Sequence, residues 1–159
     1  MNESGYRPAA NHASTAPYFM LALALIGIID ASYDSYAIYT GQLLWCPPPI
    51  DGCNTVASSP YARIFGVPLG YFGVVYYLCM FGIAALLAHA PFSRGLRLGA
   101  VLYAAIGVSF SIYFMYVQRT FIQAFCIYCL VSAVLTLLLV IAAFWHLRAT
   151  RVDAMPAPA

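Results

Sequence analysis

The chain has 159 residues, of which 64% are hydrophobic and only 8% are charged. Such a composition excludes a water-soluble domain and is typical of an integral membrane protein. The net charge of +2 is carried by scattered arginines, which excludes a basic surface for nucleic acid. We therefore expect the lipid bilayer, and no nucleic acid, among its partners.

Four apolar stretches are long enough to span a bilayer, because about 20 residues at about 1.5 Å each cross about 30 Å of hydrocarbon. They lie near residues 17–36, 66–88, 96–117 and 121–147. The predicted fold class is an all-α membrane protein, in which residues 17–147 form a four-transmembrane-helix bundle. Residues 1–16 and 148–159 are polar or rich in alanine and proline, and are predicted to be mobile tails.

The arginines predict the orientation of the bundle, because loops rich in arginine stay on the cytoplasmic side. Arg63 and Arg119 flank one side, whereas the other side is flanked by Arg7, Arg94, Arg97, Arg148 and Arg151. We therefore expect both termini to be cytoplasmic and the loops after the first and third helices to face outward. That compartment permits disulfides, which favours dithiol chemistry over a zinc site for the cysteines of these loops.

The first apolar stretch has a second interpretation, since residues 18–29 have the length of a signal-peptide core. The segment before it, however, carries a single arginine together with Glu3, and Ile29-Asp30-Ala31 lacks the small residues of a cleavage site. We therefore predict a retained helix.

The same helix carries Asp30 and Asp34, four residues apart on one face. An ionised aspartate at a helix centre costs about 2.5 to 3.5 kcal/mol to insert into a membrane. Both side chains should therefore point into the bundle or into an outer, water-filled recess. Two roles remain open: a proton path, or simple solvation of Asp34 at the membrane interface.

Cys126 and Cys129 are three positions apart, which places both sulfurs on one face of a helix and within reach of a disulfide. The predicted start of the fourth helix puts Cys126 about 7 to 8 Å inside that helix, at about 1.5 Å per residue. There the positive end of the helix favours the thiolate, which is the nucleophilic form.

Cys46 and Cys53 lie in the first outward loop, with three prolines and an Asp-Gly turn between them. Such a loop can open and close a disulfide without unfolding the bundle. The pair could instead be a permanent staple, with Cys126 and Cys129 as buried apolar side chains. Two pairs on one side favour an electron relay, because exchange needs one pair near water and one near the oxidant. Cys79, alone in the second helix, is predicted to be a buried packing residue.

The order of the paired cysteines and the residues between them resemble the vitamin K epoxide reductase family in its bacterial form. The matching segments are Cys46, residues 53–62 (CNTVASSPYA), 65–69 (FGVPL), 72–73 (FG) and 126–129 (CIYC). The resemblance extends over residues 18–147 and implies a four-helix bundle around a quinone, either ubiquinone or menaquinone. It also implies an outer loop that caps the quinone pocket through a short helix after Cys53.

Carried over by position, the resemblance implies a role for each paired cysteine. Cys129 would react with the quinone, and Cys126 would be its resolving partner. Cys53 would pass oxidation outward to Cys46, which exchanges with a thioredoxin-fold protein. Because the chain stops at Ala159 without such a domain, we expect that redox partner to be a separate protein.

The residues expected to line the quinone pocket are Ser59, Tyr61, Phe65, Phe72 and Tyr128. Ser59 could orient a quinone oxygen or contact the loop, or it could cap a turn just before the following proline. The aromatic side chains could instead be interfacial anchors or packing residues.

The predicted function is that of a membrane thiol:quinone oxidoreductase that supports disulfide formation outside the cytoplasm, in a bacterial inner membrane. Animal members of the resembled family carry polar residues where this chain has Ala133 and Leu69, which favours plain quinone reduction over epoxide reduction. Bacterial disulfide oxidases of a second family carry the cysteine pairs in the opposite order, which disfavours that family. The remaining alternative is a non-enzymatic structural membrane protein with one loop disulfide.

Overall fold

The computed structural model describes residues 9–48, 50 and 52–152. The chain forms, in order, α1 (Ala9–Thr40), α2 (Cys53–Ser58), the 3₁₀ turn η1 (Pro60–Ala62), β1 (Arg63–Ile64), β2 (Val67–Pro68), α3 (Leu69–His89), α4 (Arg94–Val117), the π-helical turn η2 (Gln118–Ile122) and α5 (Ile127–Val152). Of the predicted tails, residues 1–8 and 153–159 lie outside the described residues. The remaining parts of both tails extend α1 and α5.

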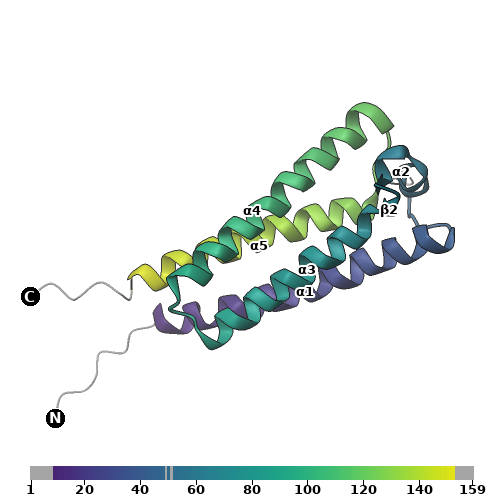
Figure 1. The fold of residues 1–159 in the computed structure, drawn as a ribbon. Coiled ribbons are helices and arrows are strands. Elements are labelled where there is room, and N and C mark those ends of the chain that lie inside the picture. The colour runs from purple at the N-terminus through teal and green to yellow at the C-terminus, as the bar shows by residue number, and fades with distance from the viewer. Residues whose placement is uncertain (1–8, 49, 51, 153–159) are drawn as a thin grey trace, which may run out of the picture.

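Four helices form the body of the protein, and each is long and apolar enough to cross a membrane. They are α1, α3, α4 and α5, and they lie lengthwise beside one another, with the short α2 and the β1–β2 hairpin gathered at one end (Figure 1). We call this the capped end and the opposite one the uncapped end. The predicted four-helix membrane fold, with a short helix in the loop between the first two spans, is confirmed.

Small side chains bring the helices together toward the uncapped end. Within a membrane, helix association depends on close van der Waals packing, which small residues at the interfaces permit. The buried side chains there come from all four helices and alternate alanines with larger apolar residues. They form the uncapped-end core: Met20, Ala24, Ala84, Leu87, Ala100 and Ala143.

The helices separate toward the capped end, where α4 diverges from α1 and α3 (Figure 1). α4 still lies close to α3 at Gly107, because a Cβ atom on this residue would overlap the phenol of Tyr76. Beyond it, aromatic and polar side chains replace the alanines. This divergence leaves room for the large cavity described below.

The cap ends in a tight hairpin, in which Arg63 pairs with Pro68 and Ile64 with Val67. Its two turn residues, Phe65 and Gly66, have φ values of 51° and 83°. Consecutive left-handed residues are typical of a two-residue hairpin turn, and the second position suits glycine. Phe65 therefore lies at the tip of the hairpin with its side chain fully exposed.

The connection from α4 to α5 differs from the prediction. We expected the fourth helix to begin near residue 121, but η2 prolongs α4 to Ile122, and α5 begins only at Ile127. Gln123, with φ of 57°, reverses the chain direction without glycine or proline. Cys126 thus immediately precedes the helix, and the predicted depth of 7 to 8 Å inside it is wrong.

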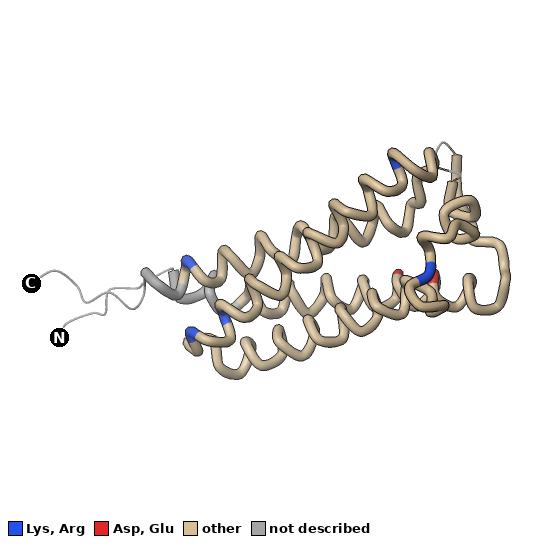
Figure 2. The backbone as a smooth tube through the Cα atoms, turned by 45° about the horizontal axis from the view of Figure 1, so that its top comes forward, with Lys and Arg blue, Asp and Glu red and all other residues tan. Residues whose placement is uncertain are grey.

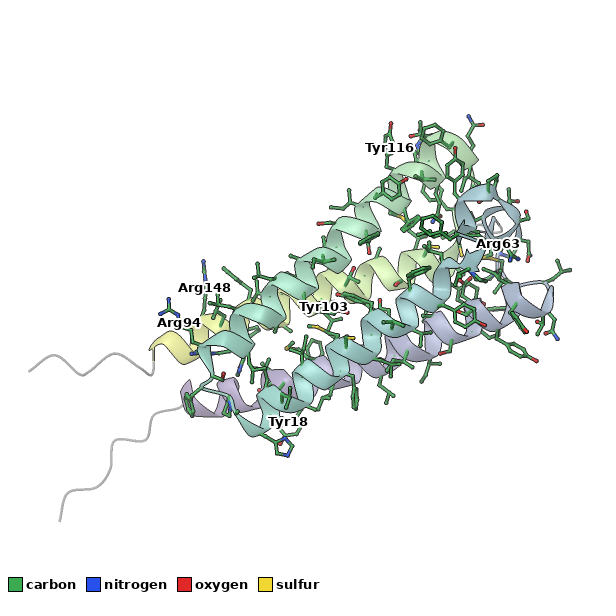
Figure 3. All side chains as sticks on the ribbon, in the orientation of Figure 1. Tyr18, Arg63, Arg94, Tyr103, Tyr116 and Arg148 are labelled. Atoms are coloured by element: carbon green, nitrogen blue, oxygen red, sulfur yellow. A yellow bond between two sulfur atoms is a disulfide. The ribbon has the colours of Figure 1, made fainter. Side chains whose placement is uncertain are left out.

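Charged residues lie almost entirely at the two ends of the described chain (Figure 2). Arg94 and Arg148 lie at the uncapped end, whereas Arg63 lies in the cap (Figure 3). The acidic residues of the described chain are Asp30 and Asp34, on the capped half of α1 (Figure 2). The arginines are therefore divided between the ends as the orientation prediction requires.

Candidate redox site

Cys46 and Cys53 form a disulfide in the loop between α1 and α2, with their Cα atoms 6.2 Å apart. Cys53 is the first residue of α2 and is completely buried. Cys46 is only partly buried. The outer pair therefore presents one sulfur toward solvent and one toward the interior.

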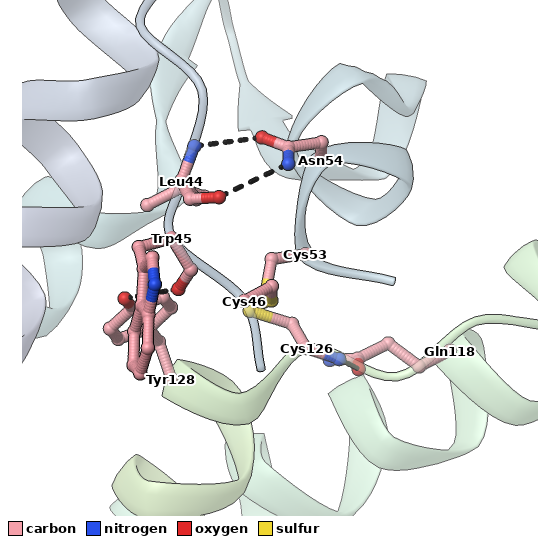
Figure 4. Close-up of a disulfide and its surroundings, with 8 residues drawn as sticks. All are labelled: Leu44, Trp45, Cys46, Cys53, Asn54, Gln118, Cys126 and Tyr128. Atoms are coloured by element: carbon pink, nitrogen blue, oxygen red, sulfur yellow. Dashed lines mark hydrogen bonds between the residues drawn. A yellow bond between two sulfur atoms is a disulfide. The ribbon is translucent and has the colours of Figure 1, made fainter. Parts of the chain in front are cut away.

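Side-chain hydrogen bonds hold this loop over the bundle (Figure 4). The Leu44 N–H donates to Asn54 Oδ1 at 2.8 Å, and Asn54 Nδ2 donates back to the Leu44 carbonyl at 3.2 Å. The Tyr128 hydroxyl, from α5, donates to the Trp45 carbonyl at 2.7 Å. The segment that leads into Cys46 is thereby attached to both α2 and α5.

Cys126 lies directly beneath this disulfide. It is 2% exposed, belongs to the same buried cluster as Cys53 and Leu44, and points its sulfur toward the disulfide (Figure 4). Cys46 and Cys129 pack against that cluster. Sulfurs from two distant segments of the chain are therefore gathered at one place, as an exchange of disulfides requires.

Cys126 is the N-cap residue of α5, because its carbonyl accepts the first helical hydrogen bond, from the Leu130 N–H at 3.1 Å. A hydrogen bond from the Cys129 thiol, aided by the backbone N–H groups of Cys129 and Tyr128, lowers the pKa of the Cys126 thiol. Burial opposes this shift without cancelling it. The helix terminus thus favours a thiolate at Cys126, which is the attacking species in thiol exchange.

Gln118 orients this cysteine from the other side. It is 2% exposed, and its side-chain oxygen accepts a hydrogen bond from the Cys126 N–H at 2.9 Å. Sequence reasoning missed Gln118, and it also missed the pair of hydrogen bonds between Asn54 and Leu44, which we call the Asn54 clamp. Glutamine and asparagine do not by themselves indicate a redox site, and their partners can be identified only once the loops have folded together.

A cavity of about 400 Å³ opens beside Cys129. Its volume is within the range of about 300 to 1,000 Å³ that is usual for small-molecule sites. All four long helices contribute to its wall, which is mostly apolar and aromatic, with a few polar groups. The lining side chains used below are Asp30, Asp34, Leu69, Phe72, Tyr128 and Cys129.

A second cavity of about 30 Å³ lies between this space and the cap. Its wall includes Cys53, Cys126 and Cys129. The small cavity therefore adjoins the inner cysteine pair and the buried member of the outer pair.

The predicted pocket residues are distributed over these two spaces. Phe72 and Tyr128 line the large cavity, and Ser59 and Tyr61 line the small one. Phe65 lines neither of them, because it lies at the exposed tip of the hairpin. A pattern of aromatic residues near a motif does not reveal which of them a tight turn directs outward.

Ser59 is engaged in local structure, since its hydroxyl donates to the Val56 carbonyl at 2.7 Å at the end of α2. This contact agrees with the turn-cap interpretation, although the residue also lines the small cavity. Cys79, in contrast, is exposed on α3, and the prediction that it is buried is wrong. A cysteine in a membrane helix can face lipid at little cost, so its residue type does not predict burial.

Comparison with known proteins gives two matches. A sequence model of the vitamin K epoxide reductase family matches residues 18–144, which include the cap, α3 and α4 and most of α1 and α5. The thiol-disulfide oxidoreductase LTO1 of Arabidopsis thaliana is 35% identical over 115 residues, which cover 69% of this chain and 31% of that protein. The chain thus corresponds to about a third of the length of this relative.

Proposed function

The chain belongs to the vitamin K epoxide reductase family, and from this premise we propose that it is an integral membrane thiol:quinone oxidoreductase. It passes electrons from a thioredoxin-fold protein through Cys46/Cys53 and then Cys126/Cys129 to a membrane quinone. One observation carries the proposal. Cys126 points at the outer disulfide, while Cys129, one helical turn further, lines a cavity large enough for a quinone ring.

Exchange with the partner protein takes place at Cys46, because this sulfur is less buried than that of Cys53. The partner's thiolate attacks Cys46 of the outer disulfide and forms a mixed disulfide, which its second thiolate resolves. The partner leaves oxidised, and Cys46 and Cys53 are left as thiols.

The inner pair then reoxidises the outer pair. The Cys53 thiolate attacks Cys126 of an inner disulfide and releases Cys129, and Cys46 then attacks Cys53 and releases Cys126. The structure corresponds to the state after this handover, with Cys46 and Cys53 joined and Cys126 and Cys129 free. The lowered pKa of Cys126 favours its release, since a thiol of lower pKa is the better leaving group.

The large cavity provides the acceptor site. A quinone, ubiquinone or menaquinone, supplies a two-electron acceptor that also takes up two protons. Phe72 and Tyr128 would contact its ring, and Cys129 would face its reacting carbon or oxygen. Leu69 lines the cavity but offers no hydrogen bond from its side chain, which supports quinone reduction over epoxide reduction.

The capped end faces the outside of a bacterial inner membrane, and both termini lie in the cytoplasm. Two features support this orientation: the arginines at the uncapped end and a disulfide at the capped end, which requires an oxidising compartment. The thioredoxin-fold partner acts on that outer side. The net result is disulfide formation outside the cytoplasm.

The decisive experiment is quinone-dependent oxidation of a reduced thioredoxin-fold protein by the purified protein. Wild type should form quinol and oxidised partner in equal amounts, whereas Cys129→Ala should form neither above background. Cys79→Ala is the matched control, because this exposed cysteine lies on α3 outside the cysteine cluster. Equal rates for wild type and Cys129→Ala would overturn the proposal and leave the loop disulfide as a structural staple.

A further inference from the structure

Two carboxyl groups of α1, Asp30 and Asp34, line the large cavity within a membrane-spanning helix. Ionisable side chains at such positions are costly to insert, and they commonly mark proton or ion pathways. The redox steps above do not use either group. Their positions relative to Cys129 distinguish them.

Asp34 lines both the large and the small cavity, whereas Asp30 lines only the large one. Four residues are common to the two walls: Asp34, Leu69, Phe114 and Cys129. Leu69 and Phe114 carry no proton that can be exchanged. At the junction of the two spaces, the groups able to pass protons are therefore the Asp34 carboxyl and the Cys129 thiol.

The packing of α1 against α3 holds the carboxyl at this junction. A Cβ atom added at Gly70 would lie 3.0 Å from Asp34 Oδ2 and closer still to the Ser35 hydroxyl. Glycine at this position makes room chiefly for the Ser35 hydroxyl, and the Asp34 carboxyl lies against the same close contact between the two helices. Asp34 is therefore held beside the cavities and does not extend along the lipid face.

The small cavity connects Asp34 with the polar groups beneath the cap. Its volume of about 30 Å³ exceeds the roughly 10 to 15 Å³ that a cavity needs to hold a water molecule. Its wall adds the side chains of Ser59 and Gln118 and the partly exposed Tyr61. The small cavity thus places Asp34 on the same wall as hydroxyl and amide groups near the cap, through which protons from the outer side can reach it.

We propose that Asp34 is the proton-transfer residue of the dithiol-to-quinone step, an inference that rests on the proposed function. In this step one S–S bond forms between Cys126 and Cys129, and the quinone gains two electrons and two protons. The Asp34 carboxylate accepts the proton of the Cys129 thiol and donates it to one quinone oxygen. The second proton comes from water through the small cavity, and it replaces the one that Cys126 released on becoming a thiolate. Asp34 ends in the state in which it began.

The test measures two half-reactions separately: reduction of the quinone by the inner cysteine pair, and exchange between the outer and inner pairs. The pre-reduced protein is mixed with a short-chain quinone, and quinol formation is followed in a single turnover. In a separate experiment, exchange between the outer and inner pairs is followed without quinone, by acid quenching and mass-tag alkylation. The variants are Asp34→Asn, Asp34→Glu and, as a matched control, Ser35→Ala, because Ser35 is the buried neighbour of Asp34 and lines neither cavity.

Asp34→Asn should slow quinol formation by about 100-fold, in the range that proton transfer by a positioned side chain contributes. It should not slow the exchange between the cysteine pairs, because the Asp34 charge raises the pKa of the Cys126 thiol and its loss does not disfavour the thiolate. Asp34→Glu should restore most of the quinol rate, because it replaces the carboxyl, and Ser35→Ala should match wild type in both measurements.

Three results would overturn the inference: wild-type quinol formation in Asp34→Asn, equal slowing of both half-reactions in that variant, or failure of Asp34→Glu to exceed Asp34→Asn. None of these touches the proposed function as long as Cys129→Ala remains inactive. If wild type itself forms no quinol while the cysteine pairs exchange, both proposals fail together.

Discussion

The two ends of the bundle are built from the same four helices but by different means. At the uncapped end, alanines and a few larger apolar side chains fill the space between the helices. At the capped end the helices diverge, and cysteines, a glutamine and two aspartates line the cavities between the helices and the cap. The uncapped end holds the helices together, and the capped end contains the candidate chemistry.

This division has a physical reason. Close packing of the helices leaves no space for a ligand. It also needs no polar side chain, so it leaves no hydrogen-bonding group unsatisfied within the membrane. A redox site needs a cavity, mobile sulfurs and satisfied polar groups, which are incompatible with such packing. Changes at the two ends should therefore separate stability from chemistry.

The largest effect is expected for Cys129→Ala at the capped end. Without the Cys129 thiol, Cys126 can still attack Cys53 of the outer disulfide and release the Cys46 thiol. Alkylation of the freed Cys46 then prevents the reverse attack and traps the bond between Cys53 and Cys126. A trapped Cys53–Cys126 bond should appear by peptide mapping under non-reducing conditions, and the thermal stability should stay near that of wild type. If this bond is absent and the Cys46–Cys53 disulfide is intact, the two cysteine pairs do not exchange with each other.

At the uncapped end, Leu87→Ala removes a fully buried side chain. We expect the free energy of unfolding to fall by about 2 to 5 kcal/mol, the usual cost of a core cavity. Quinol formation per folded molecule should be unchanged. Denaturant titration in detergent gives the stability, and turnover measured on the folded fraction gives the activity. Lost turnover at normal stability would contradict the assignment of stability to the uncapped end and chemistry to the capped end.

Gln118→Leu leaves the buried Cys126 N–H without its acceptor. The expected cost is about 1 to 3 kcal/mol, the penalty for a buried unsatisfied group. It should appear as a slower exchange between Cys53 and Cys126, since the N-cap is less well oriented. Gln118→Glu keeps an acceptor oxygen and should retain more of the stability, and equal stability of both variants would contradict a role for this hydrogen bond.

Asn54→Ala removes both side-chain hydrogen bonds to Leu44. Each is worth about 0.5 to 1.5 kcal/mol, so the loop should open more often. Dithiothreitol should then reduce the Cys46–Cys53 disulfide faster than in wild type. Asn54→Asp keeps the oxygen that accepts from the Leu44 N–H and should give an intermediate rate; identical rates in all three proteins would show that the clamp does not restrain the loop.

The smallest effect concerns the protonation of Cys126. Hydrogen bonds from Cys129 lower the pKa of Cys126, so the thiolate is present at lower pH than for an ordinary cysteine. In a background with Cys46, Cys53 and Cys79 replaced by serine, the additional change Cys129→Ala removes the thiol donor. The pH profile of Cys126 alkylation should move to higher pH. A profile that stays in place or moves to lower pH would contradict this hydrogen bond.

The sequence predicted the helices better than their junctions. Hydropathy locates four spans because lipid excludes charge over a fixed length, and each span was found. The start of the fourth helix was predicted too early, since the chain turns through a π-helical segment and a left-handed Gln123. These residues carry no glycine or proline to indicate a turn.

The site shows the same contrast. Spacing and residue type alone indicated the two cysteine pairs, because sulfur chemistry needs cysteines in pairs. Gln118, Asn54 and the dual position of Asp34 were not predictable, because their roles depend on partners far away in the chain. Phe65 and Cys79 show the converse, since their residue types suggested interior positions that the fold does not give them.

The amino-acid sequence by itself determined that this protein crosses a membrane with four helices and carries two cysteine pairs, one in a loop and one near the start of the fourth helix. These properties follow from local composition and spacing, because a membrane span needs a fixed length of apolar residues and a disulfide needs two cysteines at a suitable spacing. Only the tertiary structure decided that Cys126 faces the outer disulfide, that Cys129 faces a cavity and that Asp34 lies between them. Such relations arise from the divergence of α4 and the clamped loop, and they depend on contacts among all four helices and the cap.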